Sequence, residues 1–374
     1  MIYDGHAYCF PDLRGNGGFS SREQFRKHLQ MGAGSHFQPG WRLTDRVRIS
    51  NDSLVDLTDG WTLDALQDAG FDVAQFGRFE WDVNGDVYGK QYFPPSLREP
   101  DYPAAALVAE MDYAGIDMAL LHRTPYLGIG NDFIAECCGR YPERLQGLAH
   151  VEEWLIRSDT DECIRKLEYA VQTKGLHGLQ FLPDHLALYG QSEDWNDDAF
   201  TPFWEALSSL NIPLFVTPSY AGLATAKGAS SDHVISQLER ITTWMNKHPD
   251  VRVVLTHGLS WRIFCSGDGL EIPDAVYRAI PVSPYFYLQL LFPISLGDLW
   301  EYPMLQVKST VETLGARIGA DHLIWGTDMP IVMRFQTYRQ TLEHMYACLS
   351  EFSPNDIALV TGGNMTQLMN ISSE

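Results

Sequence analysis

The chain has 374 residues, of which 45% are hydrophobic and 20% are charged, so it can bury the core of one large α/β domain. It carries 27 Lys and Arg against 48 Asp and Glu, a formal net charge of −21, which disfavours binding to nucleic acid or to an anionic membrane. Its six cysteines form no CxxC pair, and no apolar leader follows Met1. We therefore expect a cytoplasmic protein with reduced thiols.

Eight short apolar segments have the composition of buried β-strands. They are residues 2–8, 116–122, 145–151, 178–182, 212–217, 251–256, 286–291 and 322–326. Helical segments lie between most of them, and one starts after Pro103 and stops at Gly115. Alternating strands and helices are typical of a parallel sheet, and eight strands close a barrel. The sequence therefore predicts an α/β fold, a (β/α)8 TIM barrel, with residues 1–374 as a single domain.

The segment between the first two strands, residues 10–102, is far longer than a usual loop of about 2–6 residues. It must contain structure of its own. Residues 20–30 have a helical pattern, and Asn84-Gly85 between residues 79–83 and 87–92 is a strong signal for a β-hairpin. We therefore expect an insertion with its own helix and hairpin.

Loops that follow barrel strands surround the end of the barrel where chemistry takes place. An insertion after strand 1 is therefore placed to act as a lid or as a wall of the substrate site. On this basis Glu80, Tyr92 and Phe93 are candidate substrate-binding residues.

Side chains that bind metal ions stand at the C-terminal ends of several predicted strands. They are His6, Tyr8, His122, His150, Glu152, Glu153, His257 and Asp328. Successive side chains of a strand alternate, so His6 and Tyr8 face one side. His150 and Glu152 share a face in the same way, and Glu153 takes the place of Glu152 if that strand ends early. One histidine alone usually has a structural role, but this many donors at one barrel mouth predict a metal centre.

These segments resemble the amidohydrolase-related branch of the amidohydrolase superfamily, which contains aminocarboxymuconate-semialdehyde decarboxylase and γ-resorcylate decarboxylase. The matching motifs are residues 2–8, 178–180, 212–216, 255–258, 325–330 and 363–364. The resemblance implies that His6 and Asp328 are metal ligands. It also implies that His257 is either a ligand or an acid–base residue beside the metal.

The chain departs from this family at two positions, because relatives have a histidine where Tyr8 and Thr217 stand. The other candidate ligands are available as replacements, and together they suffice for two metal ions bridged by Asp328. Phenolate and carboxylate oxygens suit iron or manganese. In this respect the chain is similar to the dinuclear TIM-barrel monooxygenases, which include the diterpenoid hydroxylase of platensimycin biosynthesis and the 2-aminoisobutyrate hydroxylase.

The leading hypothesis is a monooxygenase with an Fe/Fe or Fe/Mn pair that hydroxylates an unactivated C–H bond of a small acid or a coenzyme-A-linked substrate. It requires dioxygen as co-substrate and an external electron donor, and His257 and Tyr8 are its candidate catalytic residues. We expect homo- or hetero-oligomers of barrels.

Two alternatives remain. One is a redox-neutral decarboxylase or hydrolase with a single divalent metal such as zinc, in which His257 transfers a proton. The other is a non-catalytic barrel subunit that supports a catalytic partner.

Overall fold

The computed structural model describes residues 1–217 and 230–370, and within them all eight predicted barrel strands are present. They are β1 (Tyr3–Ala7), β7 (Met118–Leu121), β8 (Leu145–Gly147) with β9 (Ala149–His150), β10 (Leu179–Phe181), β11 (Leu214–Val216), β12 (Val253–Leu255), β15 (Phe286–Leu290) and β16 (Leu323–Trp325). Every pairing between them is parallel, in the order β1-β7-β8 and β9-β10-β11-β12-β15-β16. A parallel bridge between Ala7 and Met329 joins β1 to the chain after β16. The predicted TIM barrel is confirmed.

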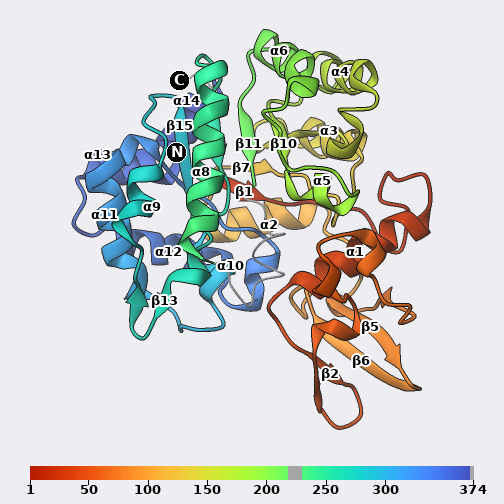
Figure 1. The fold of residues 1–374 in the computed structure, drawn as a ribbon. Coiled ribbons are helices and arrows are strands. Elements are labelled where there is room, and N and C mark those ends of the chain that lie inside the picture. Colours follow the sequence, from red (N-terminus) through yellow and green to blue (C-terminus); the bar gives the residue numbers. More distant parts are fainter. Residues whose placement is uncertain (218–229, 371–374) are drawn as a thin grey trace.

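Helices surround this barrel (Figure 1). They are α2 (Ala104–Ala114), α3 (Asn131–Arg140), α4 (Thr160–Glu168), α5 (Asp184–Leu188), α6 (Thr201–Ser209), α8 (Ser231–Lys247), α9 (Asp274–Ala279), α10 (Phe292–Leu296), α11 (Lys308–Ile318), α12 (Tyr338–Cys348), α13 (Pro354–Ala358) and α14 (Asn364–Leu368). As expected, α2 follows Pro103 and ends at Gly115, which adopts a left-handed φ of +78° and donates its N–H to the Met111 carbonyl. A small hairpin of β13 (Cys265–Ser266) and β14 (Gly269–Leu270) lies before α9.

The interior of the barrel contains a separate hydrophobic cluster. Its members come from different strands and from α14, and they include Leu120, Phe215, Val254, Ile324 and Leu368. These five residues are at most 1% exposed. Because α14 contributes to it, this cluster closes one end of the barrel. The polar side chains that follow the same strands therefore gather towards the other end.

Residues 10–102 contain a helix and a small antiparallel sheet, and they lie to one side of the barrel in Figure 1, beyond α5. The helix is α1 (Arg22–Ser35), and the sheet has the order β3 (Arg48–Ile49), β2 (Gly40–Arg42), β6 (Asp86–Gln91), β5 (Arg78–Val83) and β4 (Asp72–Val73). Asn84 and Gly85 connect β5 and β6 with φ values of +56° and +86°, as a tight hairpin turn requires. Both predicted elements of the insertion are present, and α1 continues to Ser35. Its role as a lid stays a prediction.

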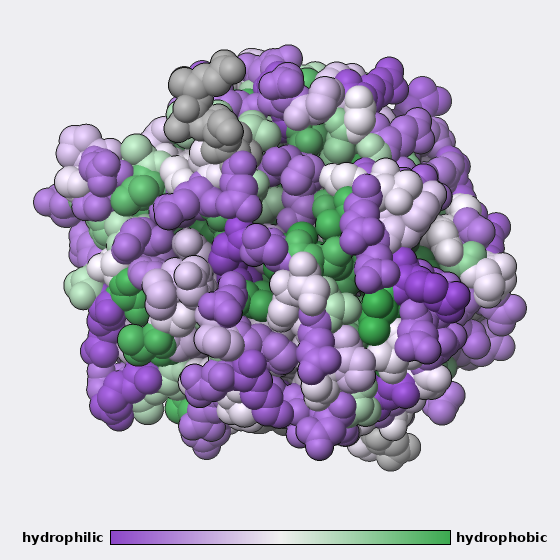
Figure 2. All heavy atoms as spheres, turned by 90° about the horizontal axis from the view of Figure 1, so that it is seen from above, coloured by the Kyte–Doolittle hydropathy of each residue, from purple (hydrophilic) through white to green (hydrophobic). Residues whose placement is uncertain are grey.

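The face shown in Figure 2 is mostly hydrophilic, and its apolar residues form separate small patches. This distribution agrees with the large excess of acidic residues in the sequence. Across residues 1–217 and 230–370, the search for a helix of the length and apolar character that a bilayer crossing needs finds none.

Candidate metal centre

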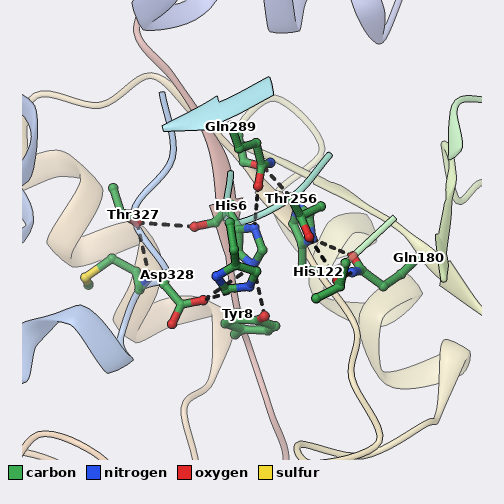
Figure 3. A network of polar contacts seen from close by, with 12 residues as sticks. His6, Tyr8, His122, Gln180, Thr256, Gln289, Thr327 and Asp328 are labelled. Carbon is green, nitrogen blue, oxygen red and sulfur yellow. Dashed lines mark hydrogen bonds and ion pairs between the residues drawn. The ribbon is translucent and has the colours of Figure 1, made fainter. Parts of the chain in front are cut away.

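Three potential metal ligands converge at the end of the barrel where β1, β12 and β16 finish. Nε2 of His6 lies 3.4 Å from Oδ1 of Asp328 (Figure 3). Nε2 of His257 lies 3.9 Å from the same oxygen. One ligand atom from each of the three residues lies within 4.8 Å of the others. His257 and Asp328 both have left-handed backbones, with φ of +58° and +69°. Such conformations are costly for residues other than glycine and are common at functional sites.

The orientation of His6 is fixed by a glutamine on β15, two strands away from β1 around the barrel. Nδ1 of His6 lies 2.8 Å from Oε1 of Gln289, and the Gln289 amide group donates to the Gly5 carbonyl at 2.7 Å. An amide oxygen can only accept, so Nδ1 of His6 carries the proton. The lone pair of the neutral ring is then on Nε2, which faces Asp328. This is the tautomer that a metal ligand needs.

Burial determines the protonation of these groups. It raises the pKa of Asp328 to about 7, lowers the pKa of His257 to about 4 and lowers the pKa of His6 well below its usual value. Oδ1 of Asp328 is buried and has no hydrogen-bond partner among the described residues. Two uncharged imidazoles around an unpartnered carboxylate oxygen fit a divalent cation. His6, His257 and Asp328 are the residues that would hold it.

Tyr8 lies beside this group, as the alternation along strand 1 predicts. Its hydroxyl is 2.8 Å from Nε2 of His6. His122 is also close, since its ring stacks on that of His6 with centroids 3.6 Å apart. Both nitrogens of His122 are engaged, however: Nε2 donates to the Gly5 carbonyl at 2.9 Å, and Nδ1 contacts the Gln180 amide at 2.5 Å. His122 therefore packs against the candidate ligand His6 and offers no lone pair to a metal there.

The predicted ligands from strand 3 form a second buried group, apart from the first. Strand β9 ends at His150, so the alternation stops there and Glu153, not Glu152, accompanies that histidine. Oε2 of Glu153 lies 3.1 Å from Nε2 of His150 and 3.6 Å from Nδ1 of His185. Glu152 points elsewhere and forms an ion pair with Lys166 at 2.8 Å. The described structure therefore does not bring these residues together with His6, His257 and Asp328 in one two-metal centre.

Glu153 is fully buried, and Oε1 accepts the backbone N–H of Leu182 at 3.0 Å. Burial alone would raise the pKa of Glu153, but the facing His150 and His185 hold it at about 2. Glu153 is thus a carboxylate at neutral pH. His185 lies on α5, and its partnership with Glu153 has no signal in the local sequence.

A cavity of about 360 Å³ opens above the candidate metal ligands. Tyr8, His257 and Asp328 line it, and about half of the other lining side chains are aromatic or aliphatic. Those on the insertion side are Phe37, Trp61 and Tyr92, and those on the barrel loops include Tyr126, Leu182 and Ile331. The size and the apolar lining suit a small organic molecule.

Of the three candidate substrate-binding residues in the insertion, only Tyr92 lines this cavity. Phe93 is 1% exposed and packs against Phe10, with ring centroids 5.0 Å apart. Glu80 lies on β5 and faces Arg78 at 3.5 Å. Alternation along a hairpin places side chains on two faces, and the sequence alone does not show which face meets the barrel.

Sequence reasoning missed the polar side chains that hold the histidines. Gln289 orients His6, and Gln180 connects His122 to Thr217 with a hydrogen bond of 2.7 Å to the threonine hydroxyl. Thr217 also accepts from Thr256 at 2.9 Å. The available signal is a glutamine in the middle of a buried apolar strand, because such a group is costly unless it has partners.

A family model described as amidohydrolase matches residues 58–368. Among curated proteins, γ-resorcylate decarboxylase of Rhodococcus jostii is 22% identical over 224 residues. That match covers 54% of this chain and 64% of the decarboxylase, so the chain spans less than two thirds of that relative.

Solved structures show the same fold. A probable 2-pyrone-4,6-dicarboxylic acid hydrolase of Acinetobacter baumannii has a TM-score of 0.54 and 17% identity, over 72% of this chain and 90% of that one. An amidohydrolase of Burkholderia multivorans with bound zinc has a TM-score of 0.56 and 14% identity, over 74% and 90% of the two chains. At these identities the likeness establishes the barrel fold alone.

These findings overturn the predicted monooxygenase. The curated relative is a decarboxylase, and nothing among the relatives supports an iron pair, dioxygen or an electron donor. The hypothesis relied on His122, His150 and Glu152 or Glu153 as replacement ligands in a two-metal centre, and the structure gives each of these residues other partners. The redox-neutral alternative fits the relatives better.

Proposed function

Because the chain belongs to the amidohydrolase family, we propose that it is a metal-dependent, non-oxidative decarboxylase of a small aromatic carboxylic acid. The observation that carries this proposal is the buried Oδ1 of Asp328, which has no hydrogen bond among the described residues and faces His6 and His257. The cavity above it has the aromatic walls that a flat ring would contact. The likeness to γ-resorcylate decarboxylase supports the reaction type.

Of the three residues that would hold the metal, His257 and Asp328 line the cavity. A divalent metal held by His6, His257 and Asp328 would polarise the substrate carboxylate. Tyr92 and Trp61 would hold the ring by its faces, and the apolar lining would keep water away from it. In the reaction the bond between the ring carbon and the carboxylate breaks, CO2 leaves, and the electron pair stays on the ring carbon.

A proton must then reach that carbon, and Tyr8 is placed to supply it. Its hydroxyl lines the cavity and donates to Nε2 of His6 when that nitrogen has a free lone pair. Tyr8 also forms a hydrogen bond with the Asp328 carboxylate, and from its place on the cavity wall it would share its proton with a ligand there. Solvent returns the proton to the phenol oxygen, so the net reaction replaces the carboxylate by hydrogen and consumes one proton.

The test is decarboxylation of a panel of hydroxylated benzoates in deuterated water by protein loaded with zinc or manganese. We expect CO2 release without any need for dioxygen and one deuterium on the carbon that carried the carboxylate. Asp328→Asn should abolish the activity, and Asp321→Asn, at an exposed aspartate before β16, should not change it. Hydrolysis of esters or lactones without CO2 release, or turnover that requires dioxygen, would overturn the proposal.

A further inference from the structure

Asp4 on β1 is a fully buried carboxylate that does not line the cavity. Its Oδ1 accepts the backbone N–H of His6 at 3.0 Å. Its Oδ2 accepts two hydroxyls, that of Thr327 at 2.6 Å and that of Tyr338 at 2.7 Å. No Lys or Arg of the described residues pairs with Asp4. A carboxylate out of water is costly unless it has hydrogen-bond partners, so each of these three neutral donors matters.

Thr327 connects Asp4 to the candidate ligand Asp328, and the two neighbouring residues are seen side by side in Figure 3. The Thr327 hydroxyl donates to Asp4 and accepts the N–H of Met329 at 3.1 Å. A hydroxyl has one proton, so donation to Asp4 leaves its lone pairs for Met329. The resulting turn encloses Asp328, whose backbone has the left-handed φ of +69°. This contact holds Asp328 in a conformation that residues other than glycine rarely adopt.

The same segment is also tied to β1 by its main chain. The N–H of Asp328 donates to the His6 carbonyl at 2.8 Å, and the N–H of Tyr8 donates to the Met329 carbonyl at 2.8 Å. Asp4 adds a side-chain connection, because one carboxylate accepts both the N–H of His6 and the hydroxyl that precedes Asp328. The placement of the two candidate ligands relative to each other therefore depends on Asp4.

Tyr338 holds Asp4 from outside the barrel strands. It is the first residue of α12 and follows the N-cap residue Thr337. A capping box fixes this turn of the helix. The Thr337 hydroxyl accepts the N–H of Gln340 at 3.3 Å, and the Gln340 side chain accepts the N–H of Thr337 at 2.9 Å. The helix end thus presents the Tyr338 hydroxyl to Asp4 at a defined position.

We propose that Tyr338 is a positioning residue of the candidate metal centre. Through Asp4 and Thr327 it holds the Asp328 carboxylate in place opposite His6. Tyr338 does not line the cavity, so it would act on a bound ligand only through these contacts. The role rests on the metal centre of the proposed function and not on the reaction that takes place there.

The test compares Tyr338→Phe with the matched control Tyr3→Phe. Tyr3 is also buried, and its hydroxyl donates to Oε1 of Gln146 at 2.7 Å, so each variant loses one buried hydrogen bond of the same length. We expect both metal-free variants to melt at a lower temperature than the unmodified protein. Tyr338→Phe alone should bind zinc about tenfold or more weakly in competition with a chromogenic chelator, as for loss of a contact that orients a ligand.

Loading with Co²⁺ gives a readout that loss of stability would not change. The visible absorption bands of the bound cobalt report its coordination, and they should shift in Tyr338→Phe and keep their positions in Tyr3→Phe. Thr327 supplies a second pair of variants in case Tyr338→Phe does not fold. Thr327→Ser keeps the hydroxyl and should bind zinc as the unmodified protein does, whereas Thr327→Val, of nearly the same shape, should bind it at least about tenfold more weakly.

Equal zinc affinities and equal cobalt spectra for Tyr338→Phe and Tyr3→Phe, or for the two Thr327 variants, would overturn the proposal. The positioning role and the proposed reaction fail separately. Weaker zinc binding by Tyr338→Phe in a protein that releases no CO2 would support the positioning role and refute the reaction. Decarboxylation by a protein whose zinc affinity does not change in Tyr338→Phe would refute the positioning role alone.

Discussion

Nε2 of His6 lies 2.8 Å from the Tyr8 hydroxyl and 3.4 Å from Oδ1 of Asp328, so one nitrogen faces both a hydrogen-bond donor and a carboxylate. Its single lone pair cannot accept from Tyr8 and bind a cation at the same time. Tyr8 and a metal therefore compete for His6. The competition links metal binding to the proton that we assign to the reaction.

Tyr8→Phe removes the competing donor. We expect the variant to bind zinc several-fold more tightly than the unmodified protein, because a hydrogen bond of about 1 kcal/mol no longer has to be broken. Decarboxylation should fall by about 10²-fold or more, as for loss of a general acid. Metal affinity is measured by competition with a chromogenic chelator, and Tyr189→Phe, at a tyrosine paired with His28, is the control. Loss of zinc from Tyr8→Phe would instead identify the phenol as a ligand.

Gln289→Leu should weaken the metal centre without touching a ligand. The glutamine holds the proton on Nδ1 of His6, and without it the ring can rotate or change tautomer. Loss of such a supporting contact typically costs about 10–100-fold in metal affinity. Gln289→Glu keeps an acceptor for Nδ1 and should retain most of the affinity. Equal zinc affinity in the leucine variant and the unmodified protein would contradict the assigned role.

The sequence is sufficient to predict the barrel and to place His6, His257 and Asp328 at the ends of its strands, because strands are recognised from local patterns. Apolar strand segments define the eight barrel strands, and alternation along one strand places Tyr8 with His6. The function of a donor depends on contacts made across the barrel. His122 looks like a ligand in the sequence, but the Gly5 carbonyl and Gln180 occupy its nitrogens, and they come from two other strands.

The second buried group, His150, Glu153 and His185, shows a related limit of prediction from the sequence. Whether Glu152 or Glu153 accompanies His150 depends on the residue at which the strand ends. Local sequence patterns predict the presence of a strand better than they predict its last residue. Here the strand ends at His150, and the short helical turn that begins at Glu153 directs that carboxylate inward. The partner on the other side, His185, comes from α5, which no short-range pattern connects to β9.

Glu153→Gln should destabilise the fold by roughly 3–5 kcal/mol at pH 7, because it leaves the buried histidines without their carboxylate. The pKa of Glu153 is about 2 in the folded protein, below its usual 4.5, so its contribution is fully present above about pH 4.5 and disappears as the pH falls towards 2. Urea unfolding at pH 7 and pH 3 should therefore give a smaller difference between the two proteins at pH 3.

Glu152→Gln is the matched control for this experiment. Its ion pair with Lys166 is partly exposed, so the loss should be about 1 kcal/mol or less at either pH. Similar losses for the two neighbouring glutamates would contradict the view that burial gives Glu153 its effect.

Asp328→Asn should stabilise the metal-free protein at pH 8 while it abolishes stabilisation by metal. Burial raises the pKa of Asp328 to about 7 from its usual 3.8, so the unfolded chain releases this proton more readily and the metal-free fold loses stability as the pH rises from about 4 to 7. An amide has no charge to desolvate, so the variant escapes this cost. Added zinc should raise the melting temperature of the unmodified protein, since a ligand that binds only the folded state shifts the equilibrium, and should leave that of Asp328→Asn unchanged. A metal-free variant that melts below the unmodified protein at pH 8 would show that Asp328 stabilises the fold without a cation, and the case for a metal centre at this carboxylate would fail with it.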